Sequence, residues 1–198
     1  YPESLEGVAR MKYEFSRNSE GSEDFYATQV NLEEEIVFEH KMVLLPEKGW
    51  EYQGIYKQTE EDKKDRERQN IYFERKILDF QGNVTLLEYF DRKGKKLSIG
   101  GVATLLREYD SYGQKTLEET LDANGELFAP KTYARYAAIY KSQGNLLMEA
   151  WYGADGELSG NETGIALTQF VYDKDGKLTI NKHFDKEGKP ASDKTGVS

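Results

Sequence analysis

Hydrophobic and polar residues alternate over short stretches of the chain, and glycine-containing segments separate these stretches. Residues 84–90 read Val-Thr-Leu-Leu-Glu-Tyr-Phe, and residues 102–109 read Val-Ala-Thr-Leu-Leu-Arg-Glu-Tyr. Successive side chains of a β-strand point to opposite faces, so this spacing is typical of strands with one more hydrophobic face. Short strands of this kind, joined by glycine turns, predict β-hairpins.

A turn motif, Asp-x-x-Gly, follows most of these stretches. Its two copies within one repeat lie twelve residues apart, as at Asp79 and Asp91. The aspartate side chain can accept hydrogen bonds from the backbone of a tight turn, and glycine adopts the positive φ that closes it. The predicted structural turn residues are Asp79, Gly82, Asp91, Gly94, Asp110, Gly113, Asp122, Gly125, Gly144, Gly156, Asp173, Gly176, Asp185 and Gly188.

The same pattern recurs with a period of about 31 residues. An alanine and a tyrosine lie six residues apart at 103 and 109, at 134 and 140, and at 166 and 172. A column of aromatic residues or leucine repeats at Phe15, Leu45, Leu78, Tyr109, Tyr140 and Tyr172. The predicted repeats are 7–37, 38–70, 71–100, 101–131, 132–163 and 164–195, of which the first two are degenerate and carry insertions.

This periodicity predicts an all-β fold, an elongated open array of about six antiparallel β-hairpin repeats in one domain, 1–198. A single hairpin is only marginally stable in water, so neighbouring repeats must associate, as a twisted single sheet or a solenoid. Residues 59–70 carry nine charges of mixed sign and predict an exposed loop or one short helix. The tyrosines at 133, 136 and 140 also have helical spacing, but alignment with the other repeats favours a strand.

Composition and charge exclude several classes of partner. Hydrophobic residues make up 37% of the chain and charged residues 32%, which suits a thin fold with much surface. The net charge of -9 argues against nucleic acid, because a phosphate-binding surface needs clustered cations. No apolar run approaches the length of a transmembrane helix, so no membrane insertion is expected. The chain begins at Tyr1 rather than methionine, as a mature form would.

The residues that carry most enzyme chemistry are scarce. The chain has no cysteine, and its two histidines are His40 and His183. Residues 173–178 resemble part of a calcium loop, but Val171 and Lys182 stand where that loop needs oxygen ligands. We therefore predict turns rather than a metal site, and no catalytic residue or cofactor. Paired-acid chemistry stays open, although the column formed by Glu88, Glu119 and Glu149 is more typical of a solvated strand face.

Alternation also assigns the two faces of each hairpin. One face, expected to be buried, holds Ala103, Leu105, Arg107 and Tyr109, the matching set Ala166, Thr168, Phe170 and Tyr172, and from the second strands Leu146, Met148, Tyr152, Leu178, Ile180 and Phe184. The opposite face holds a column of rings, with Thr120 interrupting it. These rings are the predicted ligand-binding residues Tyr56, Tyr89, Trp151 and His183. Aligned rings bind sugars or peptides, but they could equally serve in packing.

The repeated elements resemble bacterial tandem β-hairpin repeats, namely the YD repeats of Rhs-type proteins and MORN-like repeats. Residues 151–158 and 170–177 carry the resemblance best, and it covers residues 71–198. It implies a non-catalytic scaffold that is secreted or surface-associated. We therefore expect a bacterial binding module, extracellular, on the cell surface or periplasmic, that recognises a protein or glycan partner through an exposed sheet face. The alternatives are a carbohydrate- or cell-wall-binding module and a carboxylate-dependent glycoside hydrolase or lyase.

Overall fold

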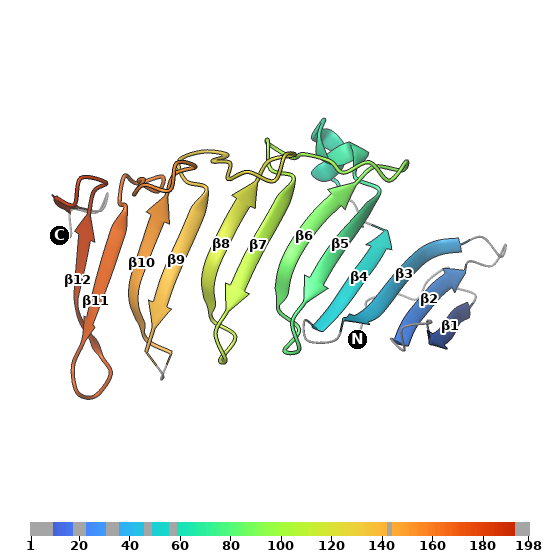
Figure 1. Cartoon of the computed structure of the whole chain (residues 1–198), viewed down its shortest axis with the longest axis horizontal. Helices are drawn as coiled ribbons and strands as arrows, with labels where there is room; N and C mark the ends of the chain where they lie inside the picture. Colours follow the sequence, from blue (N-terminus) through green and yellow to red (C-terminus); the bar gives the residue numbers. More distant parts are fainter. Residues whose placement is uncertain are drawn as a thin grey trace. The chain divides into compact units, whose positions relative to one another are not determined.

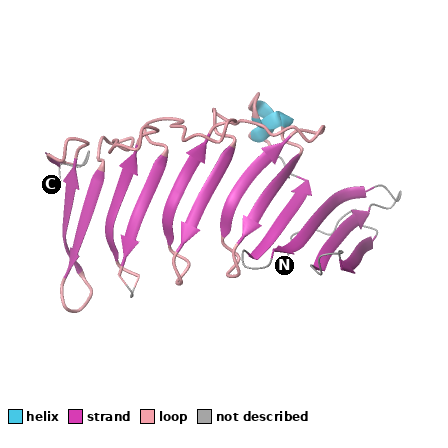
Figure 2. Ribbon diagram, in the orientation of Figure 1, coloured by secondary structure: helices cyan, strands magenta, loops and turns pink. Residues whose placement is uncertain are grey.

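The computed structural model is all-β, as the hairpin pattern predicts (Figure 2). The structure describes residues 10–17, 23–30, 36–45, 49–55, 59–141 and 144–192. The chain divides into two compact units, Tyr1–Leu97 and Ser98–Ser198, and each is considered by itself.

In the first unit each strand pairs antiparallel with its neighbour in the sequence (Figure 1). Its strands are β1 (Arg10–Arg17), β2 (Glu23–Val30), β3 (Ile36–Leu45), β4 (Gly49–Ile55), β5 (Phe73–Leu78) and β6 (Val84–Phe90). Between β4 and β5 lie two 3-10 turns, η1 (Asp62–Lys64) and η2 (Arg68–Asn70). They occupy the charged segment where the sequence predicts an exposed loop or a short helix.

The second unit repeats the same arrangement. Its strands are β7 (Thr104–Tyr109), β8 (Lys115–Leu121), β9 (Arg135–Tyr140), β10 (Leu146–Tyr152), β11 (Leu167–Tyr172), β12 (Leu178–Phe184) and the short β13 (Pro190–Ala191). All pairings are antiparallel and follow chain order, and among the described residues β7 does not pair with β13, so the array is open. The prediction of an open hairpin array is confirmed, and β9 confirms a strand rather than a helix.

A single five-residue turn closes these hairpins. In the copy that begins at Asp110, the Asp110 N–H donates to the Gln114 carbonyl and the Gly113 N–H donates to the Asp110 carbonyl, both at 3.0 Å. The Asp110 carboxylate accepts hydrogen bonds from the backbone N–H of Tyr112 at 2.9 Å and of Gln114 at 3.0 Å. Gly113 has φ 77°, a conformation that glycine adopts without strain. The aspartate and the glycine therefore act together to fix the turn.

The two backbone hydrogen bonds of this turn recur at nine places among the described residues. The turns begin at residues 79, 91, 110, 122, 141, 153, 161, 173 and 185. Every predicted turn glycine is the fourth residue of its turn and has positive φ, between 75° and 87°. One further copy, residues 161–165, is not among the predicted turns. Its first residue is Asn161, whose side-chain oxygen accepts the same backbone hydrogen bonds as the aspartates do.

Little side-chain volume is buried in the second unit. All extensive strand contacts join neighbours in the sequence, and no described helix or strand packs over either face as a second layer. The buried apolar side chains of this unit are mostly small: Ala103, Ala134, Ala138, Ala150, Ala166, Ile165 and Trp151. Several larger ones stay exposed, including Ile139, Val171, Leu178 and Ile180. Backbone pairing, turns and cross-strand contacts therefore carry much of the stability.

The predicted assignment of faces is wrong in part. Residues directly opposite each other on paired strands share a face. Leu105 lies opposite Thr120 and Thr168 lies opposite His183, so the predicted ring column shares a face with the first-strand residues expected to be buried. Leu178 and Ile180 are 45% and 49% exposed rather than buried.

The physical cause of this error is a β-bulge near each turn. Tyr172 lies opposite Leu178, but after a register shift Val171 lies opposite Ile180. The extra residue exchanges the two faces for the rest of the hairpin. The hairpins β7–β8 and β9–β10 have the same shift.

The turn glycines give a direct test of this architecture. A Cβ added at Gly125, with φ 86°, would meet no atom within 4 Å. We expect Gly125→Ala to lower the free energy of unfolding by about 1–2 kcal/mol through backbone strain alone. Gly125→Asn should cost less, since asparagine tolerates positive φ. The measurement is urea unfolding, and equal losses for alanine and asparagine would contradict the account.

Gly101 provides the matched comparison. It also has positive φ, 87°, but its added Cβ would lie 2.3 Å from the Phe128 ring. Gly101→Ala should therefore destabilise the protein more than Gly125→Ala does, because a steric clash adds to the strain.

Candidate functional site

One face of the second unit gathers aromatic and polar side chains from four successive strands. Tyr136 on β9 lies opposite Trp151 on β10, and their ring centroids are 5.8 Å apart at an interplanar angle of 56°. Glu149 stands two residues before Trp151 on β10 and so shares its face. The Tyr136 hydroxyl donates a hydrogen bond of 3.3 Å to Glu149 Oε2. A carboxylate therefore adjoins the two rings.

The face continues onto β11 and β12 through Thr168. This residue lies opposite Glu149 on one side and opposite His183 on the other. The Thr168 hydroxyl is 3.1 Å from His183 Nδ1, and the Asn181 amide nitrogen is 3.2 Å from His183 Nε2. Both imidazole nitrogens thus have polar neighbours, which fix the orientation of the ring. We call this surface the ring face and define it by Tyr136, Glu149, Trp151, Thr168, Asn181 and His183.

Burial tunes the charge of the ring face. It raises the pKa of Glu149 above the ordinary value of 4.5, although the Tyr136 hydrogen bond and the nearby His183 oppose the shift. Burial, followed by the charge of Glu149, also raises the pKa of Tyr136. A half-buried carboxylate without a cation bound directly to it binds its proton more tightly than one in water does.

The neighbouring carboxylate, Glu118, is in the opposite situation. It lies directly across from Tyr136, and its Oε2 accepts hydrogen bonds from Arg107 at 2.8 Å and Lys115 at 3.0 Å. Burial alone would raise the pKa of Glu118, but these two cations outweigh it and hold the pKa below 4.5. The Lys115 ammonium also lies 5.0 Å from the centre of the Tyr136 ring. Glu118 is therefore committed to ion pairs.

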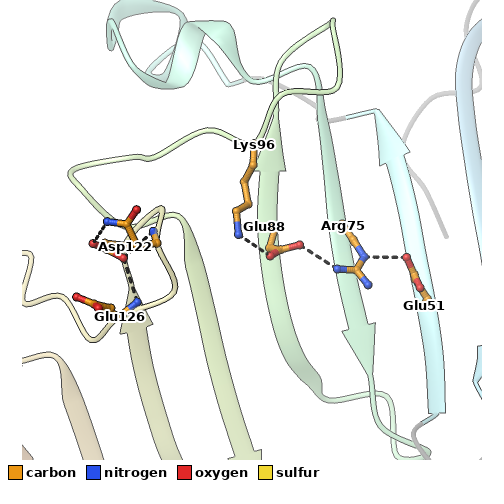
Figure 3. A network of polar contacts seen from close by, with 7 residues as sticks. Glu51, Arg75, Glu88, Lys96, Asp122 and Glu126 are labelled. Atoms are coloured by element: carbon orange, nitrogen blue, oxygen red, sulfur yellow. Dashed lines mark hydrogen bonds and ion pairs between the residues drawn. The ribbon is translucent and has the colours of Figure 1, made fainter.

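The first unit carries a row of alternating charges across β4, β5 and β6 (Figure 3). Arg75 donates hydrogen bonds to Glu51 at 2.8 Å and to Glu88 at 3.0 Å, and Lys96 donates to Glu88 at 3.1 Å. Glu88 is only 8% exposed, so its charge depends on these partners. Burial tends to raise the pKa of Glu51, but the hydrogen bonds from Arg75 and Gln53 and the charges of Arg75 and Lys41 together outweigh it, and the pKa is lowered. This row ties three strands together.

The structure places three of the four predicted ligand-binding residues. Tyr56 lies outside the described residues. Tyr89 belongs to the first unit, on β6 opposite Glu74, and is half-buried. Trp151 and His183 share the ring face of the second unit, but Trp151 is only 9% exposed. Its indole therefore forms part of the packing of this face.

Thr120 interrupts the ring column, and the structure shows what it does there. It lies on the same face as Glu118, and its hydroxyl is 2.6 Å from the Phe128 carbonyl oxygen and 3.2 Å from that of Ala134. At this position the face therefore has a hydroxyl group instead of an aromatic ring. This hydroxyl binds the segment that connects β8 to β9.

Four residues of the ring face are not among the predicted site residues: Tyr136, Glu149, Thr168 and Asn181. The prediction that Glu149 belongs to one column with Glu88 and Glu119 is wrong. Glu119 lies opposite Arg135, with which it forms an ion pair of 2.6 Å, on the face away from Glu149. The spacing from the turn glycines distinguishes the two glutamates. Glu119 lies six residues before Gly125, whereas Glu149 lies seven before Gly156, so they belong to opposite faces of their strands.

Neither a protein-family model nor a curated protein matches this chain. No helix within the described ranges is both long and apolar enough to cross a membrane. The described side chains also contain no cluster of three or more histidines and carboxylates that could hold a metal ion.

The two glutamates should give pH dependences of opposite sign. Glu118 has a lowered pKa in the folded state, so its contribution to stability is present above pH 4.5 and is lost as the pH falls through the lowered value. We expect Glu118→Gln to destabilise the protein by about 1 kcal/mol at pH 7 and to have little effect near pH 3. Urea unfolding at both pH values measures this.

Glu149→Gln is the matched variant. The pKa of Glu149 is raised, so ionising this residue above that pKa costs the folded state stability. Glutamine should therefore stabilise the protein at pH 7 and be nearly neutral near pH 3. Losses of stability at pH 7 in both variants would contradict the assigned electrostatics.

Proposed function

We propose that this chain is a non-catalytic binding module that recognises a protein or glycan partner through the ring face. One observation carries the proposal. The Tyr136 ring adjoins the Trp151 ring and the Glu149 carboxylate, the hydroxyl, imidazole and amide groups of the face follow on the next two strands, and no described helix or strand packs over them. Aromatic rings beside a few fixed polar groups are the usual composition of a recognition surface.

The exposure of each side chain indicates whether it packs within the ring face or can contact a partner. Trp151 is nearly buried and forms a rigid apolar floor. Tyr136, Glu149 and His183 are half-buried, so their polar edges can meet a partner. The contacts with Thr168 and Asn181 hold the imidazole in one orientation before binding, which reduces the entropy lost when a partner binds.

A glycan is the partner class that the polar groups favour. Sugar hydroxyls bind through paired donors and acceptors, and the half-buried Glu149 and Asn181 supply both kinds on the ring face. A carbohydrate- or cell-wall-binding module in a bacterial surface or secreted protein is therefore the first form of the proposal to test. The resemblance to YD and MORN-like repeats supports a scaffold of this kind.

The alternative of a glycoside hydrolase or lyase needs two carboxyl groups within roughly 5–10 Å of each other in one cleft. Glu149, with its raised pKa, would suit the acid. Glu118, which shares its face, is bound to Arg107 and Lys115 and is poorly placed to act as a second catalytic group. Because Glu118 is held in these ion pairs, the ring face favours a binding function over catalysis.

The test compares two double variants within the β11–β12 hairpin. Asn181→Ala with His183→Ala removes polar groups of the ring face. Gln169→Ala with Lys182→Ala removes the pair that lies opposite each other on the other face. On a glycan array, and with envelope extract as a second source of partners, we expect the ring-face variant to weaken binding at least about tenfold, and the control to bind as the parent does.

Unfolding curves establish that both variants fold before binding is compared. Equal binding by the parent and both variants, or loss only in the control variant, would place the recognition surface elsewhere. Turnover of a glycan that Glu149→Gln abolishes would favour the enzymatic alternative.

A further inference from the structure

The first unit contains a hollow where two departures from the repeat pattern meet. One is the inserted segment that ends in η2, and the other is the basic turn Asp91-Arg-Lys-Gly-Lys-Lys after β6. The hollow has a volume of about 370 Å³. Its lining residues are Asn70, Asp91, Arg92, Lys93, Lys95 and Leu97. Figure 1 shows η1 and η2 at the same end of β5 and β6 as this turn.

The turn does not need these cations for its geometry. The Asp91 carboxylate accepts hydrogen bonds from the backbone N–H of Lys93 at 2.8 Å and of Lys95 at 2.9 Å, independently of their side chains. The turn that begins at Asp122 has the same hydrogen bonds, with Asn124 and Glu126 at the corresponding positions (Figure 3). The basic side chains are therefore available for another role.

The two walls of the hollow are anchored to one strand. The Tyr72 N–H donates to the Phe90 carbonyl and the Leu97 N–H donates to the Tyr89 carbonyl, both at 2.8 Å. The Arg92 guanidinium lies 5.1 Å from the centre of the Tyr72 ring, so it is held against the wall that leads from η2. The hollow is thus part of the fold of β6 and its flanking segments.

The charges of the hollow are unusual for this protein. The chain has 36 acidic and 27 basic residues, yet no described carboxylate forms an ion pair with Arg92, Lys93 or Lys95. The carboxylate that lines the hollow, Asp91, is occupied by the backbone of its own turn. Three cations beside this one carboxylate leave the site with a net positive charge, which favours an anion.

We propose that this hollow binds an oxyanion group, a carboxylate, sulfate or phosphate, carried on a ligand about the size of one sugar ring. The planar guanidinium of Arg92 matches two oxygens of such a group, and Lys93 and Lys95 add mobile positive charges. Leu97 and the Asn70 amide offer an apolar and a polar contact to the rest of the ligand. The volume lies at the lower end of the range of roughly 300–1,000 Å³ found for small-molecule sites. This site is independent of the ring face.

The test is an NMR titration of the isotope-labelled full chain at low ionic strength. The probes are glucose 6-phosphate, glucuronate, inorganic phosphate and, as the neutral control, glucose. We expect the three anions to shift the backbone resonances of Asn70 and of residues 92–97, and glucose to leave them unchanged. Tighter binding of the two sugar anions than of inorganic phosphate would show that the site also contacts the sugar ring. Equal binding would show that it recognises the oxyanion alone.

A pair of variants separates a local site from general charge attraction. Lys93→Gln with Lys95→Gln should weaken binding of glucose 6-phosphate at least about tenfold, because each lysine can form a charge-assisted hydrogen bond. Lys186→Gln with Lys189→Gln makes the same change in net charge at the corresponding turn that begins at Asp185, and should leave binding unchanged. Arg92→Lys keeps the charge but loses the planar fork, and should weaken binding by a smaller factor.

Three results would overturn the proposal. They are equal weakening by the two glutamine pairs, equal shifts with glucose, or anion-dependent shifts that avoid residues 92–97. Unchanged resonances elsewhere in the lysine variants confirm that they fold. The ring face lies in the other unit, so the two proposals are tested separately. A negative result for anion binding would not contradict the proposed function, and a negative result for the ring face would not contradict the anion site.

Discussion

The five-residue turn that recurs through both units is the constraint on which the rest of the structure depends. In seven of its nine described copies a side-chain oxygen of the first residue accepts two backbone hydrogen bonds, and in all nine a glycine at the fourth residue adopts positive φ. With little buried side-chain volume in the second unit, hydrophobic burial alone cannot select one register. The turn selects it locally, because it fixes which residues of the two strands lie opposite each other. The low pKa of Asp122, lowered mainly by the Glu126 N–H, reflects the same contact.

This constraint also explains which parts of the structure the sequence could predict. Turn residues such as Asp110 and Gly113 act through their own backbone, so a single sequence shows them. The strands were predicted from the alternating hydrophobic and polar residues between these turns. The face of each side chain depends on a bulge, and neither Tyr172 nor Leu178 has a chemical feature that marks one. The prediction of the faces failed for this reason.

The candidate sites were harder to predict because they join residues from different strands. Tyr136 and Glu149 meet across β9 and β10, and Thr168 meets His183 across β11 and β12. Such contacts depend on register, which the bulge shifts by one residue. The hollow beside β6 joins Asn70 to Lys95 across a complete hairpin. Counting residues from each turn glycine would have placed Glu149 correctly, but it would not have found the hollow.

A sheet of one layer exposes two faces, and the second unit uses them differently. The ring face carries hydrogen-bonding groups held by one another. The other face carries apolar side chains such as Ile139, Val171 and Ile180, which remain substantially exposed. The glycines and aspartates are needed for the turns, and the alanines fit the strand packing. The side chains of the ring face are not needed for either purpose, and for this reason we place recognition there.

The central claim is that the ring face is open to solvent and to partners. The most direct measurement is the relaxation that a neutral, soluble paramagnetic gadolinium chelate causes in the side-chain resonances of the second unit. The account predicts strong relaxation of the Tyr136 and His183 rings on one face and of the Ile139 and Ile180 methyl groups on the other. Protection of the Tyr136 and His183 rings, with relaxation only on the other face, would show that the ring face is covered and would contradict it.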